Sequence, residues 1–158
     1  MIIQDNIGCC SFECIGKSRA LCLDYGDKRI GVALSDIGWN IASPLVVLDS
    51  HGVFPKLLKI IEENKVGVIV VGAPQSLAGG SSGKQHEKVK KFTEKLDELA
   101  KDIIIVFWDE RYSSVAATRA LVEAEMTHAK KKQYIDKVAA SFILQGFLNY
   151  VVFSRRNS

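Results

Sequence analysis

Three acidic residues in remote parts of the chain are the side chains best suited to chemistry. Asp24 interrupts the apolar run 21–23, and a carboxylate in such a strand-like run is costly to bury without a partner. Glu110 closely follows the apolar run 103–108, and Asp136 stands where the last helical stretch is expected to begin. A metal ion could stabilise all three carboxylates, so their placement suggests a metal-dependent site rather than a solvated surface.

Carboxylates crowded into one pocket repel each other, and their proton affinities rise unless a cation neutralises them. Mg²⁺ or Mn²⁺ does this with oxygen ligands, and two such ions about 3.5–4 Å apart can activate water for phosphodiester cleavage. The alternative is structural. Asp109 and Glu110 could cap a following helix or lie in solvent, and Asp136 could be a first-turn acid paired with Lys132 or Lys137. The spacing alone leaves both interpretations open.

Hydrophobic patterning predicts the elements that must position these acids. Strands are expected at 20–25, 29–35, 41–48, 66–71 and 103–108. Helices are expected at 53–63, 84–100, 113–124 and 135–152, and a loop rich in Gly and Ser at 75–83. The first two strands read as a hairpin, and Pro44 favours an edge position for the third. Three strands that can pair antiparallel, followed by β-α units, predict an α/β fold with a mixed sheet between helices.

The length of 158 residues is that of one domain. An apolar content of 47% and a charged content of 25% are ordinary for a soluble globular protein, and the net charge of +3 permits nucleic-acid binding without arguing for it. We expect a single domain at 19–153, a poorly ordered N-terminal extension at 1–18 and a tail at 154–158. No apolar stretch is expected to be long enough to cross a membrane, and residues 1–18 lack the features of a secretory signal.

The four cysteines all lie near the N-terminus, and we expect them to be reduced, as in a cytosolic protein. Cys22 falls in the first strand and is expected to be a small core residue. Cys9, Cys10 and Cys14 could bind a metal, but no second Cys or His pair at zinc spacing follows them.

Basic side chains that could attract a nucleic-acid backbone are Lys84, Lys88, Lys90, Lys91 and Lys130–Lys132. Binding through such charges should weaken as the salt concentration rises. A solvated helix face explains Lys90, Lys91 and Lys95 equally well. Trp39 could stack on bases, whereas Trp108 is expected in the core.

Four motifs resemble, in the same order, those of the YqgF (RuvX) family. They are LDYGDKRIGVALSD at 23–36, VGAP at 71–74, DERYSS at 109–114, and IDKVAA at 135–140 followed by ILQ at 143–145. The resemblance spans about residues 20–150, which makes it more specific than any single motif. The family is described as Holliday-junction-resolvase-like and as the nuclease that processes the precursor of 16S ribosomal RNA.

The resemblance implies an RNase H-like fold with five strands flanked by helices. It also implies that the catalytic, metal-binding acids are Asp24, Glu110 and Asp136, with Mg²⁺ or Mn²⁺ as cofactor. The predicted substrate-binding residues are Arg29, Lys28, Arg111, Lys84 and Lys132, and the planar guanidinium of arginine suits phosphate oxygens. Ser113 and Ser114 replace two family threonines, and the loop 75–82 lacks the family's Asn and acidic residues.

The resemblance therefore predicts a cytoplasmic, metal-dependent endonuclease that matures the 5′ end of the 16S rRNA precursor, as a monomer or a homodimer. Three alternatives remain open. The chain could resolve Holliday junctions in branched DNA, which would call for a symmetric dimer. It could be a non-catalytic nucleic-acid-binding module, since fold does not fix function. It could handle ATP, because a hairpin carrying Asp-x-Gly resembles the phosphate-binding strands of the actin and sugar-kinase fold.

Overall fold

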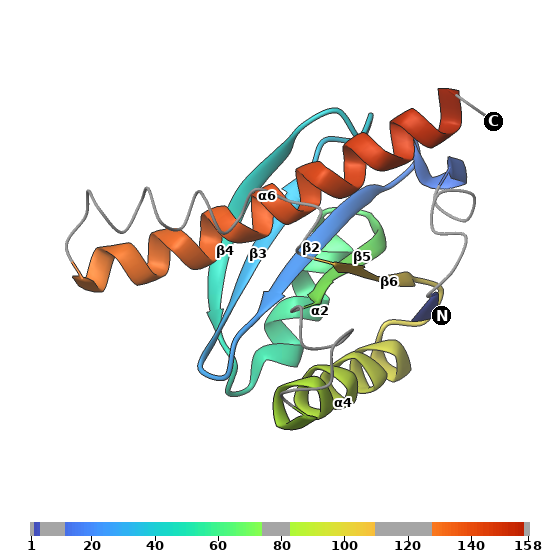
Figure 1. Cartoon of the computed structure of the whole chain (residues 1–158). Coiled ribbons are helices and arrows are strands. Elements are labelled where there is room, and N and C mark those ends of the chain that lie inside the picture. Colours follow the sequence, from blue (N-terminus) through green and yellow to red (C-terminus); the bar gives the residue numbers. More distant parts are fainter. Residues whose placement is uncertain (1, 4–11, 74–82, 110–127, 157–158) are drawn as a thin grey trace.

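The computed structural model of the chain describes residues 2–3, 12–73, 83–109 and 128–156 (Figure 1). Side chains are described for Ile2 and within 13–72, 87–108 and 138–156. The predicted helix at 113–124 and most of the predicted loop at 75–83 lie outside these residues.

The described strands form one mixed sheet. They are β1 (Ile2–Ile3), β2 (Arg19–Tyr25), β3 (Arg29–Ser35), β4 (Ala42–Asp49), β5 (Val66–Ala73) and β6 (Ile104–Asp109). In the sheet order β1-β6-β5-β2-β3-β4, strands β2, β3 and β4 pair antiparallel, and β1, β6, β5 and β2 pair parallel. The five predicted strands and the hairpin are confirmed. The two-residue β1 adds a sixth strand that the sequence did not predict.

Helices cover both faces of this sheet, as predicted. α2 (Val53–Glu63) and α4 (Gly83–Leu99) lie on one face, and α6 (His128–Arg156) crosses the other (Figure 1). A short 3₁₀ helix, η1 (Phe12–Cys14), precedes β2.

The side-chain alternation of β2 divides the core into two layers. Leu21 and Leu23 belong to the cluster under α2 and α4. Ala20 and Cys22 belong to the cluster under α6, which also contains Phe147. Cys22 is fully buried, which confirms the prediction that it is a small core residue.

Strand β4 is the edge strand that Pro44 predicted. Its register shifts by one residue against β3, because Val46 pairs with Val32 but Pro44 pairs with Ala33. Such a bulge is one of the places where a sheet accepts a residue that has no backbone N–H to donate.

Helix α6 begins earlier than expected, at His128 instead of residue 135. The basic run Lys130–Lys132 is therefore part of the helix and not a linker before it. This run contains no Gly or Pro that would stop a helix. Asp136 consequently lies more than two turns inside α6, at about 3.6 residues per turn, so the prediction that it occupies the first turn is wrong.

The segment Val138–Arg156 of α6 is long and apolar enough to cross a membrane by length and composition. The expectation that no stretch meets this criterion is therefore wrong. Part of the apolar content belongs to the fold, because Ala140, Ile143 and Phe147 are buried in the cluster that packs α6 against the sheet. A helix that forms the core of a globular domain needs the same composition.

Candidate active site

Asp24 is a buried carboxylate on the face of the sheet that α6 covers. Alternation along β2 places it on the side of Ala20 and Cys22, both of which pack in the α6 cluster. Its relative exposure is 9%, in a strand whose preceding four residues are all fully buried. Burial of an ionised carboxylate costs on the order of several kcal/mol unless a partner compensates it, and a metal ion is one kind of partner. A charged residue in a central strand is therefore a candidate for a functional group.

The strands on both sides of Asp24 carry glycine near its level. Gly31 of β3 is its cross-strand partner. On β5, Val71 pairs with Leu23, so the next residue, Gly72, follows at the level of Asp24. Neither glycine has a side chain to cover the carboxylate, although cross-strand Cβ atoms normally lie only about 4.5–5.5 Å apart. At the level of Asp24, the two neighbouring strands therefore place no side chain against its carboxylate.

The backbone of α6 places position 136 on the stripe of this helix that faces the sheet. Positions 136, 140, 143 and 147 follow the i, i+4, i+7, i+11 spacing of one helix face. Ala140, Ile143 and Phe147 on this stripe are fully buried in the cluster shared with β2 and β3. Position 136 is therefore on the face of α6 that is turned toward the same side of the sheet as Asp24, and the side chain of Asp136 lies outside the described residues.

The third acid follows the end of β6. This strand ends at Asp109, whose backbone pairs with Ala73 at the end of β5, and β5 lies beside β2. The carboxyl ends of β2, β5 and β6 therefore meet at one edge of the sheet, where open α/β sheets commonly bind ligands. Glu110 is the next residue after this edge and lies outside the described residues.

The chemistry of these three groups suits a hard divalent cation. Carboxylate oxygens are the protein ligands that Mg²⁺ and Mn²⁺ prefer. Within the described residues, no cluster of three His, Cys, Asp or Glu side chains is close enough to hold a metal. Only Asp24 of the predicted ligand set has a described side chain, so the shared site of Asp24, Glu110 and Asp136 stays a prediction.

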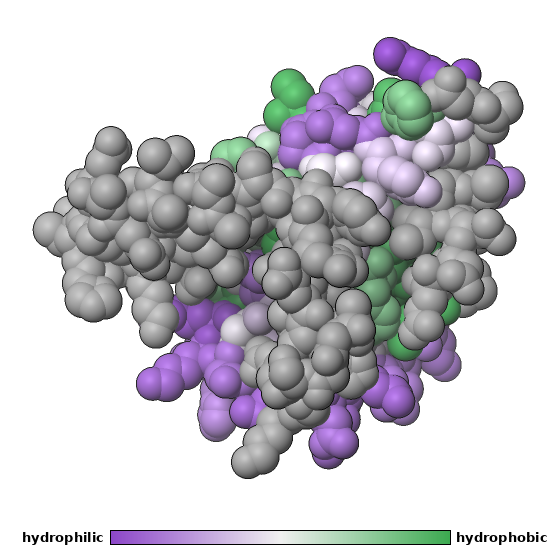
Figure 2. Space-filling view, viewed as in Figure 1, coloured by the Kyte–Doolittle hydropathy of each residue, from purple (hydrophilic) through white to green (hydrophobic). Residues whose placement is uncertain are grey.

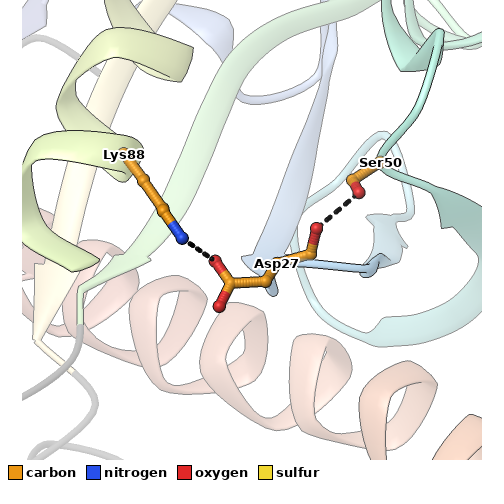
Figure 3. A network of polar contacts seen from close by, with 3 residues as sticks. All are labelled: Asp27, Ser50 and Lys88. Carbon is orange, nitrogen blue, oxygen red and sulfur yellow. Dashed lines mark hydrogen bonds and ion pairs between the residues drawn. The ribbon is translucent and has the colours of Figure 1, made fainter. Parts of the chain in front are cut away.

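Charged groups surround the turn between β2 and β3. Lys88 of α4 forms an ion pair with Asp27 of this turn, with 3.2 Å between Nζ and Oδ1 (Figure 3). Ser50 donates a hydrogen bond from Oγ to the carbonyl oxygen of Asp27 at 2.7 Å. Lys28 is exposed and Arg29 is half-buried, and hydrophilic residues gather at the bottom of the view around α4 and this turn (Figure 2).

The substrate-binding role of the basic residues stays a prediction. Lys84 lies in α4 and Lys132 in α6, but their side chains are not among the described residues, and Arg111 lies outside them entirely.

The structure corrects the expectation that Trp39 could stack on bases. Trp39 is fully buried and its Nε1 donates to the carbonyl oxygen of Ser18 at 2.9 Å, so its ring is not available for stacking on bases.

Two residues that the sequence did not single out are Asp36 in the β3–β4 connection and Gln145 in α6. Asp36 accepts hydrogen bonds at Oδ1 from the backbone N–H groups of Asn40 and Ile41, at 2.7 and 2.9 Å. Burial raises the pKa of Asp36, but these bonds and one from the Asn40 side chain outweigh it, so its pKa lies below the usual 3.8. Gln145 of α6 contacts the same connection, and its only signal in the sequence is its place in the ILQ motif.

The chain matches known proteins over most of its length. A family model described as "RuvX: Holliday junction resolvase" matches residues 18–150. Proteins named "Putative pre-16S rRNA nuclease" from Staphylococcus epidermidis, Thermoanaerobacter pseudethanolicus and Desulforamulus reducens are 44%, 44% and 45% identical to it. These alignments cover 85%, 83% and 83% of this chain and 98%, 96% and 96% of the respective relatives.

A solved structure shows the same fold. It is the T. thermophilus RuvC in complex with a Holliday junction substrate, with a TM-score of 0.53 over 89% of this chain and 97% of that chain. Their sequences are only 10% identical, so this likeness concerns the fold alone. It confirms the predicted RNase H-like architecture, a mixed sheet with helices on both faces. The length of the family match and the identity of the relatives together show that this chain belongs to the RuvX family.

Proposed function

We propose that this protein is a metal-dependent endonuclease that hydrolyses a phosphodiester bond in the precursor of 16S rRNA, at or near its 5′ end. Membership of the RuvX family and the names of its relatives support the nuclease class and the RNA substrate. The observation that carries the proposal is the buried carboxylate of Asp24 between two glycine-bearing strands, on the face that α6 covers.

Asp24, Glu110 and Asp136 would hold Mg²⁺ or Mn²⁺ in this site. When bound, such an ion lowers the pKa of water and stabilises negative charge on the leaving oxygen. Asp24 contributes a carboxylate whose position is fixed, because it is part of a central strand paired on both sides. Its rigidity matters since a displacement of about 1 Å at an active site can cost on the order of a hundredfold in rate.

The residues around the site account for access and for substrate attraction. Gly31 and Gly72 keep the space beside Asp24 free of side chains from the neighbouring strands. Arg29, Lys28, Arg111, Lys84 and Lys132 are proposed to contact the phosphates of the substrate. Such contacts position the backbone and make affinity fall as salt concentration rises.

Branched DNA is the second candidate substrate, because the family description and the fold neighbour's title both refer to Holliday junctions. The RNA substrate is favoured because relatives more than 40% identical over nearly their full length carry the rRNA-nuclease name. Processing of a ribosome precursor would take place in the cytoplasm, and a single chain, acting as a monomer, suffices for one cut. Resolution of a junction would require a homodimer, because two matched strands are cut.

A substrate panel tests the proposal directly. The purified protein is incubated with a transcript that contains the 16S 5′ precursor end, an unrelated structured RNA and a four-way DNA junction, each with Mg²⁺, Mn²⁺ or EDTA. We expect metal-dependent cleavage of the precursor transcript, and its loss in Glu110→Gln and Asp136→Asn. Cleavage of the junction alone would replace the RNA substrate by branched DNA. Binding without cleavage of any substrate, unchanged in these variants, would support a non-catalytic module instead.

A further inference from the structure

Gln145 joins α6 to the sheet through backbone atoms of Asn40, in the β3–β4 connection, and of Ala42, at the start of β4. We propose that Gln145 is a positioning residue, whose amide sets the axial register of α6 and thereby the level of Asp136 relative to Asp24. This inference rests on the proposed function and deepens it, because it names a residue that controls the metal site without touching the metal.

The amide of Gln145 matches two backbone groups of opposite polarity. Its Oε1 accepts a hydrogen bond from the N–H of Ala42 at 2.9 Å, and its Nε2 donates to the carbonyl oxygen of Asn40 at 3.1 Å. Nε2 also donates to Oδ1 of Asn149, one turn further along α6, at 3.0 Å. A carboxamide has one acceptor oxygen and two donor hydrogens, so these three bonds use both ends of the side chain.

The connection that Gln145 holds is itself fixed. Asp36 binds the backbone N–H groups of Asn40 and Ile41, and Ala42 pairs with Ser35 in the sheet. Gln145 therefore ties α6 to a defined point of the sheet. The cluster of described residues that packs α6 against the sheet is apolar, and apolar contact is not directional. Hydrogen bonds with fixed partners define the position of a helix along its axis more sharply.

The distance along β2 from the level of this contact to Asp24 agrees with the distance along α6 from Gln145 to Asp136. Ser35 pairs with Ala42 in the sheet, and its hydroxyl accepts a hydrogen bond from the N–H of Ala20 at 2.8 Å. The anchor, which is the contact of Gln145 with the backbone of Asn40 and Ala42, therefore lies at the level of Ala20. Asp24 follows Ala20 by four residues, which is roughly 13 Å along a strand. Asp136 precedes Gln145 by nine residues, which is also roughly 13 Å along a helix.

The directions of the two elements agree as well. Strand β2 and helix α6 run in opposite directions in Figure 1. The direction from Gln145 toward the start of α6 is therefore the same as the direction along β2 from Ala20 toward Asp24. Anchoring α6 at Gln145 brings position 136 to the level of the carboxylate on the sheet.

The test separates positioning from general destabilisation by comparing three variants with the parent protein. Gln145→Leu removes both backbone contacts at similar volume, and Gln145→Glu keeps an acceptor for Ala42 but loses the donor for Asn40. Val151→Ala is the control, because Val151 is a fully buried residue of α6 whose loss destabilises the helix without touching the anchor. Amide hydrogen exchange at Ala42 reports whether the anchor is broken.

The readouts are Mn²⁺ affinity, measured by electron paramagnetic resonance, and kcat and KM for the precursor RNA. We expect Gln145→Leu to weaken Mn²⁺ binding and lower kcat by about tenfold or more, as for other residues that support metal ligands, with KM changed less than about twofold. Gln145→Glu should show a smaller loss in the same direction. Val151→Ala should keep the Mn²⁺ affinity of the parent.

Two results would overturn the inference, and they differ in what they say of the function. In the first, the parent cleaves RNA and binds Mn²⁺, but both Gln145 variants behave like Val151→Ala although amide exchange at Ala42 is faster. The positioning role is then wrong, and the nuclease proposal stands. If the parent neither cleaves nor binds Mn²⁺, the proposed function fails and the inference fails with it. If Gln145→Leu does not fold, the result for Gln145→Glu decides.

Discussion

Asp24 of β2 is paired with Gly31 of β3, so the strand beside this buried carboxylate has no side chain at its level. A side chain added at position 31 would lie about 4.5–5.5 Å from Asp24, measured between Cβ atoms, on the face that α6 covers. The pairing thus leaves β3 without a side chain in the space where the proposed metal and phosphate would have to fit.

Substitution Gly31→Val should fill this space. We expect metal-dependent cleavage to fall by about tenfold or more, together with an overpacking cost of about 1–3 kcal/mol in the free energy of unfolding. Ala33→Val is the matched control, because Ala33 lies on the same face of the same strand but pairs with Cys22. Rates and urea unfolding curves of both variants check the prediction. Equal loss of activity in both would mean that the space beside Asp24 has no special role.

The sequence predicted five strands of the sheet and the helices α2 and α4 well, because these elements depend on local patterning. Alternation in the hairpin and continuous apolar runs in the parallel strands are visible in any short window. The start of α6 was missed because a run of lysines resembles a polar linker, although nothing in it prevents a helix. Asp136 was therefore placed in a first turn that it does not occupy.

Other features depend on contacts between distant parts of the chain. Gln145 binds residues about a hundred positions away, and its partners are backbone atoms, which leave no signature in residue type. Trp39 lies in a short connection, and its burial depends on Ser18 and on the ring of Phe147, 5.9 Å away between centroids. Asp24 could be identified from the sequence because a charged residue within an apolar strand is unusual. This can be seen without knowing which residues surround it in space.

Trp39 is expected to be a major stabilising residue. It is fully buried, its Nε1 donates to Ser18, and its ring contacts Phe147. Trp39→Ala should lower the free energy of unfolding by about 3–5 kcal/mol, as for other buried aromatic residues. Trp39→Phe keeps most of the apolar volume and loses the hydrogen bond, so its cost should be smaller. Urea unfolding measures both, and a cost below about 1 kcal/mol for Trp39→Ala would contradict the packing described here.

The ion pair between Asp27 and Lys88 should affect nucleic-acid binding more than stability. Both side chains are more than half exposed, at 56% and 54%, and such pairs contribute about 0–1 kcal/mol to folding. Asp27→Asn releases Lys88 and should tighten RNA binding at low salt. Lys88→Gln should weaken binding and reduce the slope of log affinity against log salt by about 1. Affinities measured at several salt concentrations test this, and unchanged slopes would exclude Lys88 from the binding surface.

Asp36 should make stability depend on pH in the acidic range. Its folded-state pKa lies below 3.8, so its ionised form stabilises the fold. This contribution is fully present above 3.8 and is lost as the pH falls through the lower folded-state pKa. Asp36→Asn should therefore be less stable than the parent at neutral pH, and the difference should shrink well below pH 3.8. Urea unfolding at a series of pH values checks this, and a difference that grows on acidification would have the wrong sign.

The most direct test of the central claim is the binding of Mn²⁺ to Asp24→Asn, compared with the parent and with Asp49→Asn. Asp49 is an exposed acid at the end of the edge strand β4, so its replacement removes one negative charge that does not belong to the proposed set of metal ligands. We expect the parent and Asp49→Asn to bind Mn²⁺ with similar affinity and to gain thermal stability from it, as mass action requires. Asp24→Asn should fold but lose both effects. Mn²⁺ binding by Asp24→Asn with the affinity of the parent would contradict the claim that Asp24 helps to hold the catalytic metal.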